Sequence, residues 1–311
     1  MTRSLVTGGS GFIGRHLVTA LMARDHRVRI LDIEPPREAL PGVEYVHGSI
    51  LDDSIVASSL RDIEQVYHLA GISHLWTPCV DDFRRVNCDG TKALLVAARE
   101  AGVARFLYCS SETVDLGASA DDLPGPYSRS KFLAEQAVRT AARDGLPVVI
   151  VAPTVTIGPS DDNSTPGTAM LTGFLARRLQ FYFDCTLNLV DVRDVARGMV
   201  LAAEVGREGE RYLLGGTNIS VCDLLALVER VTKHKRVRIS VPGTIAFVIA
   251  AFSEMIATYI THRPPLAPVE GVRLARILPA IAIDKAQREL GYEARPLEST
   301  LEDAVAHVGG W

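Results

Sequence analysis

The chain has 311 residues, of which 47% are apolar, so it is long and apolar enough to bury a large core. This composition excludes disordered and fibrous proteins. Lysine and arginine number 33 against 37 acidic residues, giving a net charge of −4, and no basic cluster is dense enough to indicate nucleic-acid binding.

The first predicted elements are a strand, a glycine-rich turn and a helix, at residues 4–7, 8–14 and 15–23. N–H groups in the first turn of a helix are unsatisfied and partly positive, so they bind a pyrophosphate where no Cβ blocks it. Gly8 would permit the tight turn, Gly11 the phosphate contact and Gly14 the packing of helix on strand. A turn without a ligand is a second interpretation, but the flanking strand and helix favour a dinucleotide site.

The second predicted strand, residues 28–31, ends at Asp32, eighteen positions after the last glycine of the turn. In a βαβ cofactor site, an acid at about 20 residues accepts hydrogen bonds from the adenosine ribose, and its charge repels a 2′-phosphate. We therefore expect NAD as the cofactor. NADP stays an alternative because Arg3, Arg15 or Arg37 could reach a phosphate, and Asp32 could instead only open a polar loop.

Strand and helix patterns alternate along the first half of the chain. The predicted strands cover residues 4–7, 28–31, 43–46, 65–69, 106–109 and 148–151. Several are continuous apolar runs, which is typical of strands buried on both faces of a parallel sheet. The clearest predicted helix covers residues 82–101. The sequence therefore predicts an α/β fold with a Rossmann-type doubly wound parallel sheet.

The pattern changes after Pro153, where a polar loop is followed by helices and short strands. Residues 1–153 are predicted to form a dinucleotide-binding Rossmann domain, to which part of 186–203 returns. Residues 154–311 are predicted to form mainly a smaller, mixed α/β C-terminal lobe that binds the substrate. The short strands expected there cover residues 187–190, 212–214 and 238–241.

Tyr127 and Lys131 lie four residues apart in a predicted helix, so both side chains emerge on one face. A free tyrosine, with a pKa of about 10, is a poor base, but a neighbouring ammonium, helped by the positive nicotinamide ring, favours the phenolate. The same lysine can hold the hydroxyls of the nicotinamide ribose. Such a spacing also arises by chance on an exposed helix. Ser110 and Ser111, directly after the strand at 106–109, favour catalysis because a hydroxyl there can hold a substrate oxygen.

The most apolar segment of the chain covers residues 244–260. Its uncharged core at 244–252 is nine residues long, short of the roughly 20 that span a bilayer. We favour a helix packed into the C-terminal lobe. The alternative is an apolar face in peripheral contact with a membrane or with an apolar substrate.

The five cysteines are odd in number and scattered without a CxxC pair. This pattern fits reduced thiols and argues against structural zinc, so no metal site is expected. The chain enters its first strand directly and shows no signal peptide, so we expect a cytoplasmic protein.

Several motifs occur in a characteristic order: TGGSGFIG at 7–14, HLAG at 68–71, NCDGT at 87–91, the serine pair, YSRSK at 127–131 and VDVRDV at 190–195. The order resembles that of extended short-chain dehydrogenases/reductases, also called the NAD-dependent epimerase/dehydratase family, over almost the whole chain. Within that family, segments 74–76, 125–135, 186–190 and 210–216 resemble the hopanoid-associated sugar epimerase subgroup. Dihydroflavonol reductases and 3β-hydroxysteroid dehydrogenases are its neighbours.

The resemblance implies roles for the matching residues. Ser111 would hold the substrate oxygen, Tyr127 would act as acid and base, and Lys131 would tune it. A substrate would lie between Trp76, Ser111 and Asn188. The residues expected to line the cofactor are Gly8, Gly11, Phe12, Ile13, Gly14, Asp32, Ser49, Ile50, Leu69, Ala70, Gly71, Asn87, Tyr127, Lys131 and Pro153. Ser49 stands where relatives usually have an aspartate that contacts adenine, and Ile50 would cover the ring.

Two departures from the family pattern bear on the reaction. Sugar-nucleotide dehydratases carry Thr-Asp-Glu at the serine position, whereas residues 111–113 are Ser-Glu-Thr and lack the final carboxylate base, which argues against dehydration. Nucleotide-sugar epimerases usually place a diphosphate-binding arginine where this chain has Cys185, and a neutral thiol cannot neutralise a diphosphate. Arg177, Arg178 and Arg193 are candidates to replace that arginine.

We therefore expect reversible hydride transfer at a secondary alcohol or ketone of a small, apolar substrate. The alternative is a nucleotide-sugar epimerase that uses tightly bound NAD and the same groups twice. A third interpretation is a non-catalytic cofactor-binding protein. We also expect a homodimer, in which the helices near 82–101 and 127–143 pair with those of a second copy.

Overall fold

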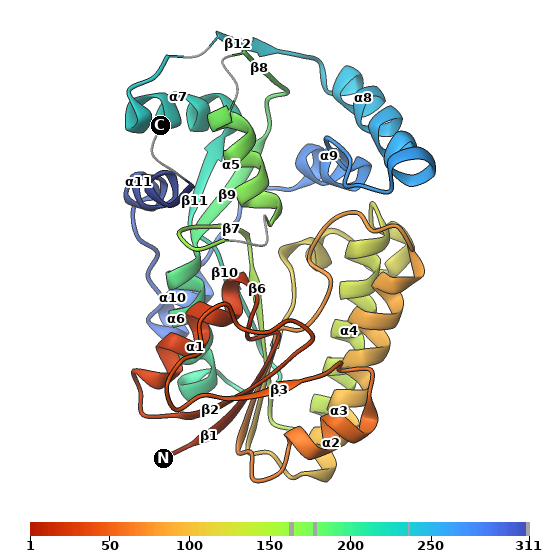
Figure 1. Cartoon of the computed structure of the whole chain (residues 1–311), viewed down its shortest axis with the longest axis vertical. Helices are drawn as coiled ribbons and strands as arrows, with labels where there is room; N and C mark the ends of the chain where they lie inside the picture. Colours follow the sequence, from red (N-terminus) through yellow and green to blue (C-terminus); the bar gives the residue numbers. More distant parts are fainter. Residues whose placement is uncertain (162–164, 177–178, 236, 309–311) are drawn as a thin grey trace.

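The computed structural model describes residues 1–161, 165–176, 179–235 and 237–308 (Figure 1). A seven-stranded parallel sheet, in the order β10-β6-β5-β4-β1-β2-β3, forms the larger half. Its strands are β1 (Arg3–Thr7), β2 (Arg27–Asp32), β3 (Glu44–His47), β4 (Gln65–His68), β5 (Arg105–Cys109), β6 (Val148–Pro153) and β10 (Arg211–Leu214). All six strands predicted for the first half of the chain are present, which confirms the doubly wound parallel sheet.

Helices cover both faces of this sheet (Figure 1). One layer contains α1 (Phe12–Met22), α6 (Val192–Val205) and α10 (Asp284–Leu290). The other contains α2 (Asp53–Ser59), the π-helical η1 (Phe83–Gly90), α3 (Thr91–Glu100) and α4 (Pro126–Arg143). Strand side chains alternate between the layers: Val149 and Val151 of β6 pack in the first core, and Val148 and Ile150 in the second. The helix predicted over 82–101 is thus η1 followed by α3.

The strand order reverses at β1, which pairs with β2 on one side and with β4 on the other. Consecutive crossovers leave in opposite directions from such a point, so a crevice opens at the carboxyl ends of β1 and β4. Two short 3₁₀ turns, η2 (Glu112–Leu116) and η3 (Ala120–Asp122), follow β5 at the same edge.

The C-terminal lobe has a smaller sheet in the order β11-β9-β7, formed by β7 (Val155–Ile157), β9 (Thr186–Asp191) and β11 (Thr217–Ser220). Helices α5 (Pro166–Ala176), α7 (Val221–Thr232) and α11 (Leu297–Val308) pack with it around a separate core. Strands β8 (Leu179–Tyr182) and β12 (Val237–Ser240) form a two-stranded ribbon. Of the region 186–203, only α6 returns to the large sheet, because β9 pairs within the lobe. The chain returns again at β10 and α10, beyond the predicted segment.

The apolar segment forms α8 (Gly243–Ile256) and the π-helical η4 (Ala257–Thr261), followed by α9 (Val269–Ile277). The expected packing of this segment into the lobe is wrong, because only Ala250 and Ala257 are fully buried and most large side chains are exposed. Together α8 and η4 make a 19-residue helix of mean hydropathy 1.6, which is long and apolar enough to cross a membrane by length and composition. The length of nine uncharged residues was too short because Ser253, Glu254 and Thr258 do not interrupt the helix.

Candidate active site

The glycine turn after β1 is shaped by its own packing. Gly8 has a φ of +72°, and a Cβ there would lie 2.7 Å from the backbone nitrogen of Ala70. A Cβ on Gly14 would overlap the carbonyl oxygen of Gly8. The atom nearest to a Cβ on Gly11 is that same oxygen, at 3.3 Å. Gly11 precedes α1 and provides no side-chain cap, so the first N–H groups of the helix are open to an anion.

The end of β2 fits an adenosine ribose. The Asp32 carboxylate accepts hydrogen bonds from the backbone nitrogens of Ser10, at 2.9 Å, and Glu34, at 3.1 Å, which fixes it beside the glycine turn. The Ser10 hydroxyl is buried without a hydrogen-bond partner, as expected of a group that a ligand completes. Arg3 is no candidate for a 2′-phosphate, because it begins β1 at the opposite edge of the sheet and pairs with Asp62 at 3.1 Å.

A chain of buried hydrogen bonds joins the ends of β1 and β4 to the helices. His68 Nδ1 lies 2.8 Å from Thr7 Oγ1, and His68 Nε2 lies 2.8 Å from Thr91 Oγ1. Because Thr91 donates its own proton to the Asn87 carbonyl at 2.6 Å, Nε2 is the donor of the imidazole and Nδ1 the acceptor. Burial, assisted by the charge of Lys131, lowers the pKa of His68 to about 3, so the ring is neutral.

Asn87 links this network to the helix that carries Tyr127. Its Oδ1 accepts from the nitrogen of Ile72 at 2.7 Å, and its Nδ2 donates to the Ile72 carbonyl at 3.0 Å and to Ser130 Oγ at 2.9 Å. Ser130 in turn donates to the Tyr127 carbonyl at 2.7 Å. The Asn87 amide therefore holds the loop that contains residues 69–71 next to the first turn of α4.

The three predicted catalytic residues meet at the carboxyl end of β5. Ser111 precedes η2, and Tyr127 and Lys131 lie in the first two turns of α4. The Ser111 side chain hydrogen-bonds the buried Tyr127 phenol. Lys131 Nζ donates to the Cys109 carbonyl at 2.8 Å and lies 5.1 Å from the centroid of the Tyr108 ring.

Burial controls the charge states of this group. It raises the pKa of Tyr127 well above the ordinary value, and the hydrogen bond from Ser111 only partly opposes this effect. It also lowers the pKa of Lys131. The phenol of the structure therefore carries its proton, and the expectation stays that the Lys131 ammonium and the positive ring of a bound nicotinamide together favour the phenolate.

A buried carboxylate that was not predicted fixes the serine loop. Glu135 on α4 accepts hydrogen bonds from Ser110 Oγ and from Arg211 Nε, the latter at 3.2 Å. Arg211, on β10, also donates to the Ser111 carbonyl at 2.8 Å. Glu135 lies eight residues after Tyr127, a spacing that places both on one face of the helix. This spacing is the signal by which the sequence could have indicated Glu135.

A second carboxylate reaches the site from the other lobe. Glu270 on α9 is 4% exposed and accepts hydrogen bonds from the backbone nitrogens of Tyr127, at 3.0 Å, and Ser128, at 2.8 Å. It also accepts from Ser128 Oγ at 2.6 Å. Glu270 thereby caps the N-terminus of α4, where negative charge is favourable. No local pattern signals this contact, because 143 residues separate Glu270 from Tyr127.

Glu112 is buried directly after Ser111. Burial raises its pKa to about 8, although the charge of Arg211 acts in the opposite direction, so the carboxyl is largely protonated at neutral pH. Thr113 has no carboxylate and donates its hydroxyl to Ser111 Oγ at 3.1 Å. Neither residue after Ser111 therefore offers a charged carboxylate here, and the absence of dehydration stays a prediction.

Asn188 has a structural function that leaves no hydrogen-bonding position for a substrate. Its Oδ1 accepts from Thr154 Oγ1 and from the nitrogen of Gly216, each at 2.8 Å. Its Nδ2 donates to the Gly216 carbonyl at 3.3 Å and to Asn218 Oδ1 at 3.0 Å. Because an amide offers two acceptor and two donor positions, the predicted substrate contact of Asn188 is not supported.

The other predicted lining residues lie around the crevice and its rim. Ser49 and Ile50 lie between β3 and α2, and Pro153 ends β6 at the carboxyl edge of the sheet. Trp76 lies in the loop between β4 and η1, and its Nε1 donates to Thr258 Oγ1 of η4 at 3.2 Å. Trp76 therefore connects this loop to the apolar helix.

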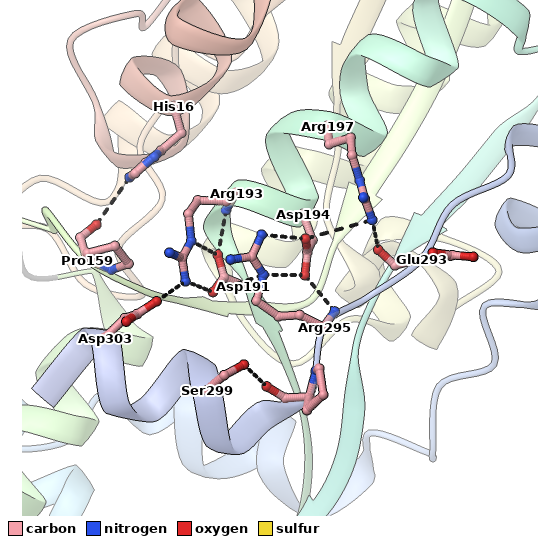
Figure 2. A network of polar contacts seen from close by, with 11 residues as sticks. His16, Pro159, Asp191, Arg193, Asp194, Arg197, Glu293, Arg295, Ser299 and Asp303 are labelled. Carbon is pink, nitrogen blue, oxygen red and sulfur yellow. Dashed lines mark hydrogen bonds and ion pairs between the residues drawn. The ribbon is translucent and has the colours of Figure 1, made fainter.

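Ion pairs of the VDVRD motif connect the start of α6 to the C-terminal segment (Figure 2). The Arg193 guanidinium lies 2.6 Å from oxygens of both Asp191 and Asp303, and Arg295 pairs with Asp194 at 2.9 Å. Since Arg193 is held by two carboxylates, it is not available to replace the missing diphosphate-binding arginine. The other two candidates, Arg177 and Arg178, lie outside the described residues.

A cavity of about 680 Å³ opens in the lobe between segment 183–186, segment 241–244 and the C-terminal end of α9. Cys185 lies in its wall, where burial and the charge of Asp184 raise the pKa of the thiol to about 11. The thiol is therefore neutral, as expected. Arg276 lines the same cavity, whereas Ser111, Tyr127 and Lys131 do not.

Comparison with known proteins gives a consistent picture. A family described as "NAD dependent epimerase/dehydratase family" matches residues 4–215. A putative dihydroflavonol 4-reductase of Synechocystis sp. is 33% identical, over 96% of this chain and 92% of that protein. Sterol demethylase protein B of Methylococcus capsulatus is 30% identical over 97% of each. The crystal structure of gox2253 has a TM-score of 0.80 at 33% identity, over 98% of this chain and 97% of that one.

Proposed function

The chain belongs to the NAD-dependent epimerase/dehydratase family, and from that membership we propose that it transfers a hydride reversibly between NAD and a secondary alcohol or ketone of an apolar substrate. It is an enzyme of the extended short-chain dehydrogenase/reductase type. The observation that carries the proposal is the meeting of Ser111, Tyr127 and Lys131 at the carboxyl edge of the sheet, at the end of β5 and two strands from the glycine turn.

Each catalytic side chain has one task. Ser111 and Tyr127 hydrogen-bond the substrate oxygen. In reduction, Tyr127 gives its proton to that oxygen, and in oxidation the phenolate takes a proton from the alcohol. Lys131 stabilises the phenolate. When bound, NAD supplies the nicotinamide carbon that exchanges a hydride with the carbon bearing the oxygen.

The apolar character of the substrate is supported from two sides. The neutral thiol of Cys185 offers no charge to a diphosphate. Dihydroflavonols and sterols, named in the two sequence relatives, are predominantly carbon frameworks with few charges. Glu112 is also largely neutral, so the serine loop adds little charge to the site.

A nucleotide-sugar epimerase is the second candidate, and one observation favours it. Arg276 lines the same cavity as Cys185, so a guanidinium is available there to pair with a diphosphate. The same Ser111, Tyr127 and Lys131 would then act twice, oxidising the sugar carbon and reducing it from the other face.

The finer statements on partners and location are proposals as well. We propose a cytoplasmic homodimer in which α3 and α4 of each copy pair, because these neighbouring helices expose Val96 and Leu133. The exposed apolar segment at 244–260 supports a peripheral contact with a membrane.

Turnover with purified full-length protein tests the function. A 3β-hydroxysteroid or a dihydroflavonol should produce a net change in NADH absorbance, and Tyr127→Phe should lower kcat by about 10²- to 10⁴-fold while calorimetry finds NAD affinity nearly unchanged. Tyr182→Phe, on β8 of the C-terminal lobe, is the matched control. Product formed from a nucleotide sugar without net redox would select the epimerase.

Two results would overturn the proposal. Substantial activity in Tyr127→Phe would remove the phenol from the chemistry. If calorimetry on folded protein detected neither NAD nor NADP, the enzymatic function would fail altogether.

A further inference from the structure

The helix formed by α8 and η4 has its apolar side turned outward. Ile245, Val248, Phe252, Met255 and Tyr259 recur at intervals of three and four residues, so they share one face, and all five are exposed. Val248 is 65% exposed, Phe252 61% and Tyr259 78%. A helix of a water-soluble protein normally directs such residues to the core. The apolar face of this helix is therefore turned away from the core.

The inner face carries the small and polar residues instead. Ala250 and Ala257 are buried, and Ser253 Oγ donates to the Ala267 carbonyl at 3.3 Å. The Glu254 carboxylate accepts from the nitrogen of Val269, at 2.6 Å, at the start of α9. These hydrogen bonds hold the polar side of the helix against the start of α9. They therefore fix the orientation in which the apolar side faces outward.

The same contacts argue against a helix that crosses a bilayer. A helix that crossed would have to leave its polar partners Ala267 and Val269. Its two ends would also lie on opposite sides of the bilayer, so β12 before it and α9 after it could not both stay in the lobe. Its length and composition instead suit a helix that lies in the interface, with one face immersed among the acyl chains.

The ribbon before the helix also exposes apolar side chains. Phe181 of β8 and Val237 of β12 are each 62% exposed, and Ile239 is also exposed. Figure 1 shows the ribbon and α8 at the same end of the molecule, away from the large sheet, with no other element beyond them. The exposed side chains therefore extend over more than one element at that end.

The charge around this surface distinguishes two possible binding partners, a second copy of the chain and an anionic lipid surface. Residues 233–266 contain five lysines and arginines but one acid, Glu254, which is turned inward. One of these cations, Arg238, pairs with Glu229 at 3.6 Å. Lys233 and Lys235 before α8, and Arg263 after η4, are exposed. A second copy docked symmetrically on this face would bring like charges together. Anionic lipid headgroups would pair with them.

We propose that the outward face of α8 and η4 docks on the surface of an anionic phospholipid bilayer, with the helix axis in the plane of the interface. Apolar side chains enter the acyl region, and the flanking cations contact the phosphates.

Two contacts link the docking helix to the elements that hold the catalytic group. Trp76 connects η4 to the loop after β4, and α9, which packs on α8, carries the Glu270 that caps the helix of Tyr127. An apolar substrate could then pass from the lipid to the site. This delivery rests on the proposed function, whereas the docking itself does not.

Vesicle sedimentation of the full chain with NAD tests the docking. Vesicles of phosphatidylcholine mixed with phosphatidylglycerol should bind the protein, phosphatidylcholine alone should bind it less, and added salt should weaken the binding. Val248→Asp and Phe252→Asp should each reduce the partition coefficient on the order of tenfold or more, because each removes one large side chain from the lipid.

Val205→Asp is the matched control, because Val205 is 56% exposed but lies at the end of α6. It should bind vesicles as the unsubstituted chain does. Absence of binding to either vesicle, or binding that Val248→Asp leaves intact, overturns the proposal. So does a loss of self-association on Val248→Asp without an effect on vesicles. Since no turnover is measured, failure here leaves the proposed enzymatic function standing.

Discussion

Glu270 connects the two lobes at the level of a single residue. Its carboxylate accepts three hydrogen bonds from the first turn of α4 and adds negative charge near the Tyr127 phenol. That charge raises the pKa of the phenol. Glu270 is therefore a positioning residue that acts on catalysis through Tyr127, without contact with the substrate.

Glu270→Gln should lower kcat on the order of tenfold with little change in KM, because the amide disturbs the cap but not the substrate pocket. Removing the negative charge also favours the phenolate, so the pH profile of kcat should shift to lower pH. Steady-state kinetics over a pH series measures both effects. Glu254→Gln is the matched control, since Glu254 caps α9 and not α4. If kcat fell but the pH profile did not shift, Glu270 would have only a structural role and no effect on the Tyr127 phenol.

His68 predicts an acid-dependent stability. Its pKa falls from the ordinary value of 6.5 to about 3 in the folded chain, so between these values the unfolded chain binds more protons. The free energy of unfolding therefore decreases as the pH falls through this range, by up to about 1.4 kcal/mol per pH unit from this group.

His68→Asn should flatten this acid dependence, even if it lowers the stability at neutral pH by leaving Thr7 or Thr91 with a weaker partner. Urea unfolding at a series of pH values below 6.5 gives the slope. His47→Asn, at an exposed histidine, should leave the slope as it is. An equal slope in the His68 variant would contradict a buried neutral imidazole.

Among the elements, the glycine turn contains one residue that serves binding, Gly11, and one that serves packing, Gly14. Gly11→Ala should fold, because the new Cβ meets one atom within 4 Å, the Gly8 carbonyl oxygen at 3.3 Å, and a shift of a few tenths of an ångström relieves this tight contact. NAD affinity should nevertheless fall at least on the order of tenfold, because the methyl meets the pyrophosphate. Gly14→Ala should instead destabilise the fold, since its Cβ overlaps the Gly8 carbonyl. Calorimetric NAD titration and thermal unfolding distinguish the two, and unchanged NAD affinity in Gly11→Ala would place the phosphate elsewhere.

Local pattern predicted most of the elements but not the direction in which one of them faces. Strand runs such as Val148–Pro153 can be read from the sequence because both faces are apolar. The YxxxK spacing likewise located Tyr127 and Lys131, because both belong to one helix. The exposure of α8 could not be predicted, because hydropathy counts apolar residues without saying whether protein or another medium covers them.

At the scale of the whole molecule, long-range contacts set the limits of prediction. Nothing near Arg211 indicates that β10 joins the large sheet beside β6, or that its guanidinium reaches Glu135 on α4. The contacts of Asn188 within the lobe sheet are equally remote in sequence. Such contacts depend on which distant segments lie together in the fold, and a local sequence pattern carries no information on that.

The proposed homodimer gives a prediction at this scale. If α3 and α4 form the contact, Val96→Asp should weaken the dimer by placing a charge in an apolar interface, and light scattering after size exclusion should show the monomer mass. Val96 is 48% exposed, and Val205→Asp on α6 is the matched control that should leave the mass unchanged. A monomer mass for the unsubstituted chain would contradict the dimer.

The late position of β10 in the chain has a consequence for biosynthesis. A ribosome must deliver residues 211–214 before the edge of β6 is covered and before the buried carboxylate of Glu135, which already pairs with Arg139 on α4, gains its second cation from that strand. The nucleotide half of the chain should therefore not mature while it is being translated, and a fragment ending before residue 211 should fail as an autonomous unit.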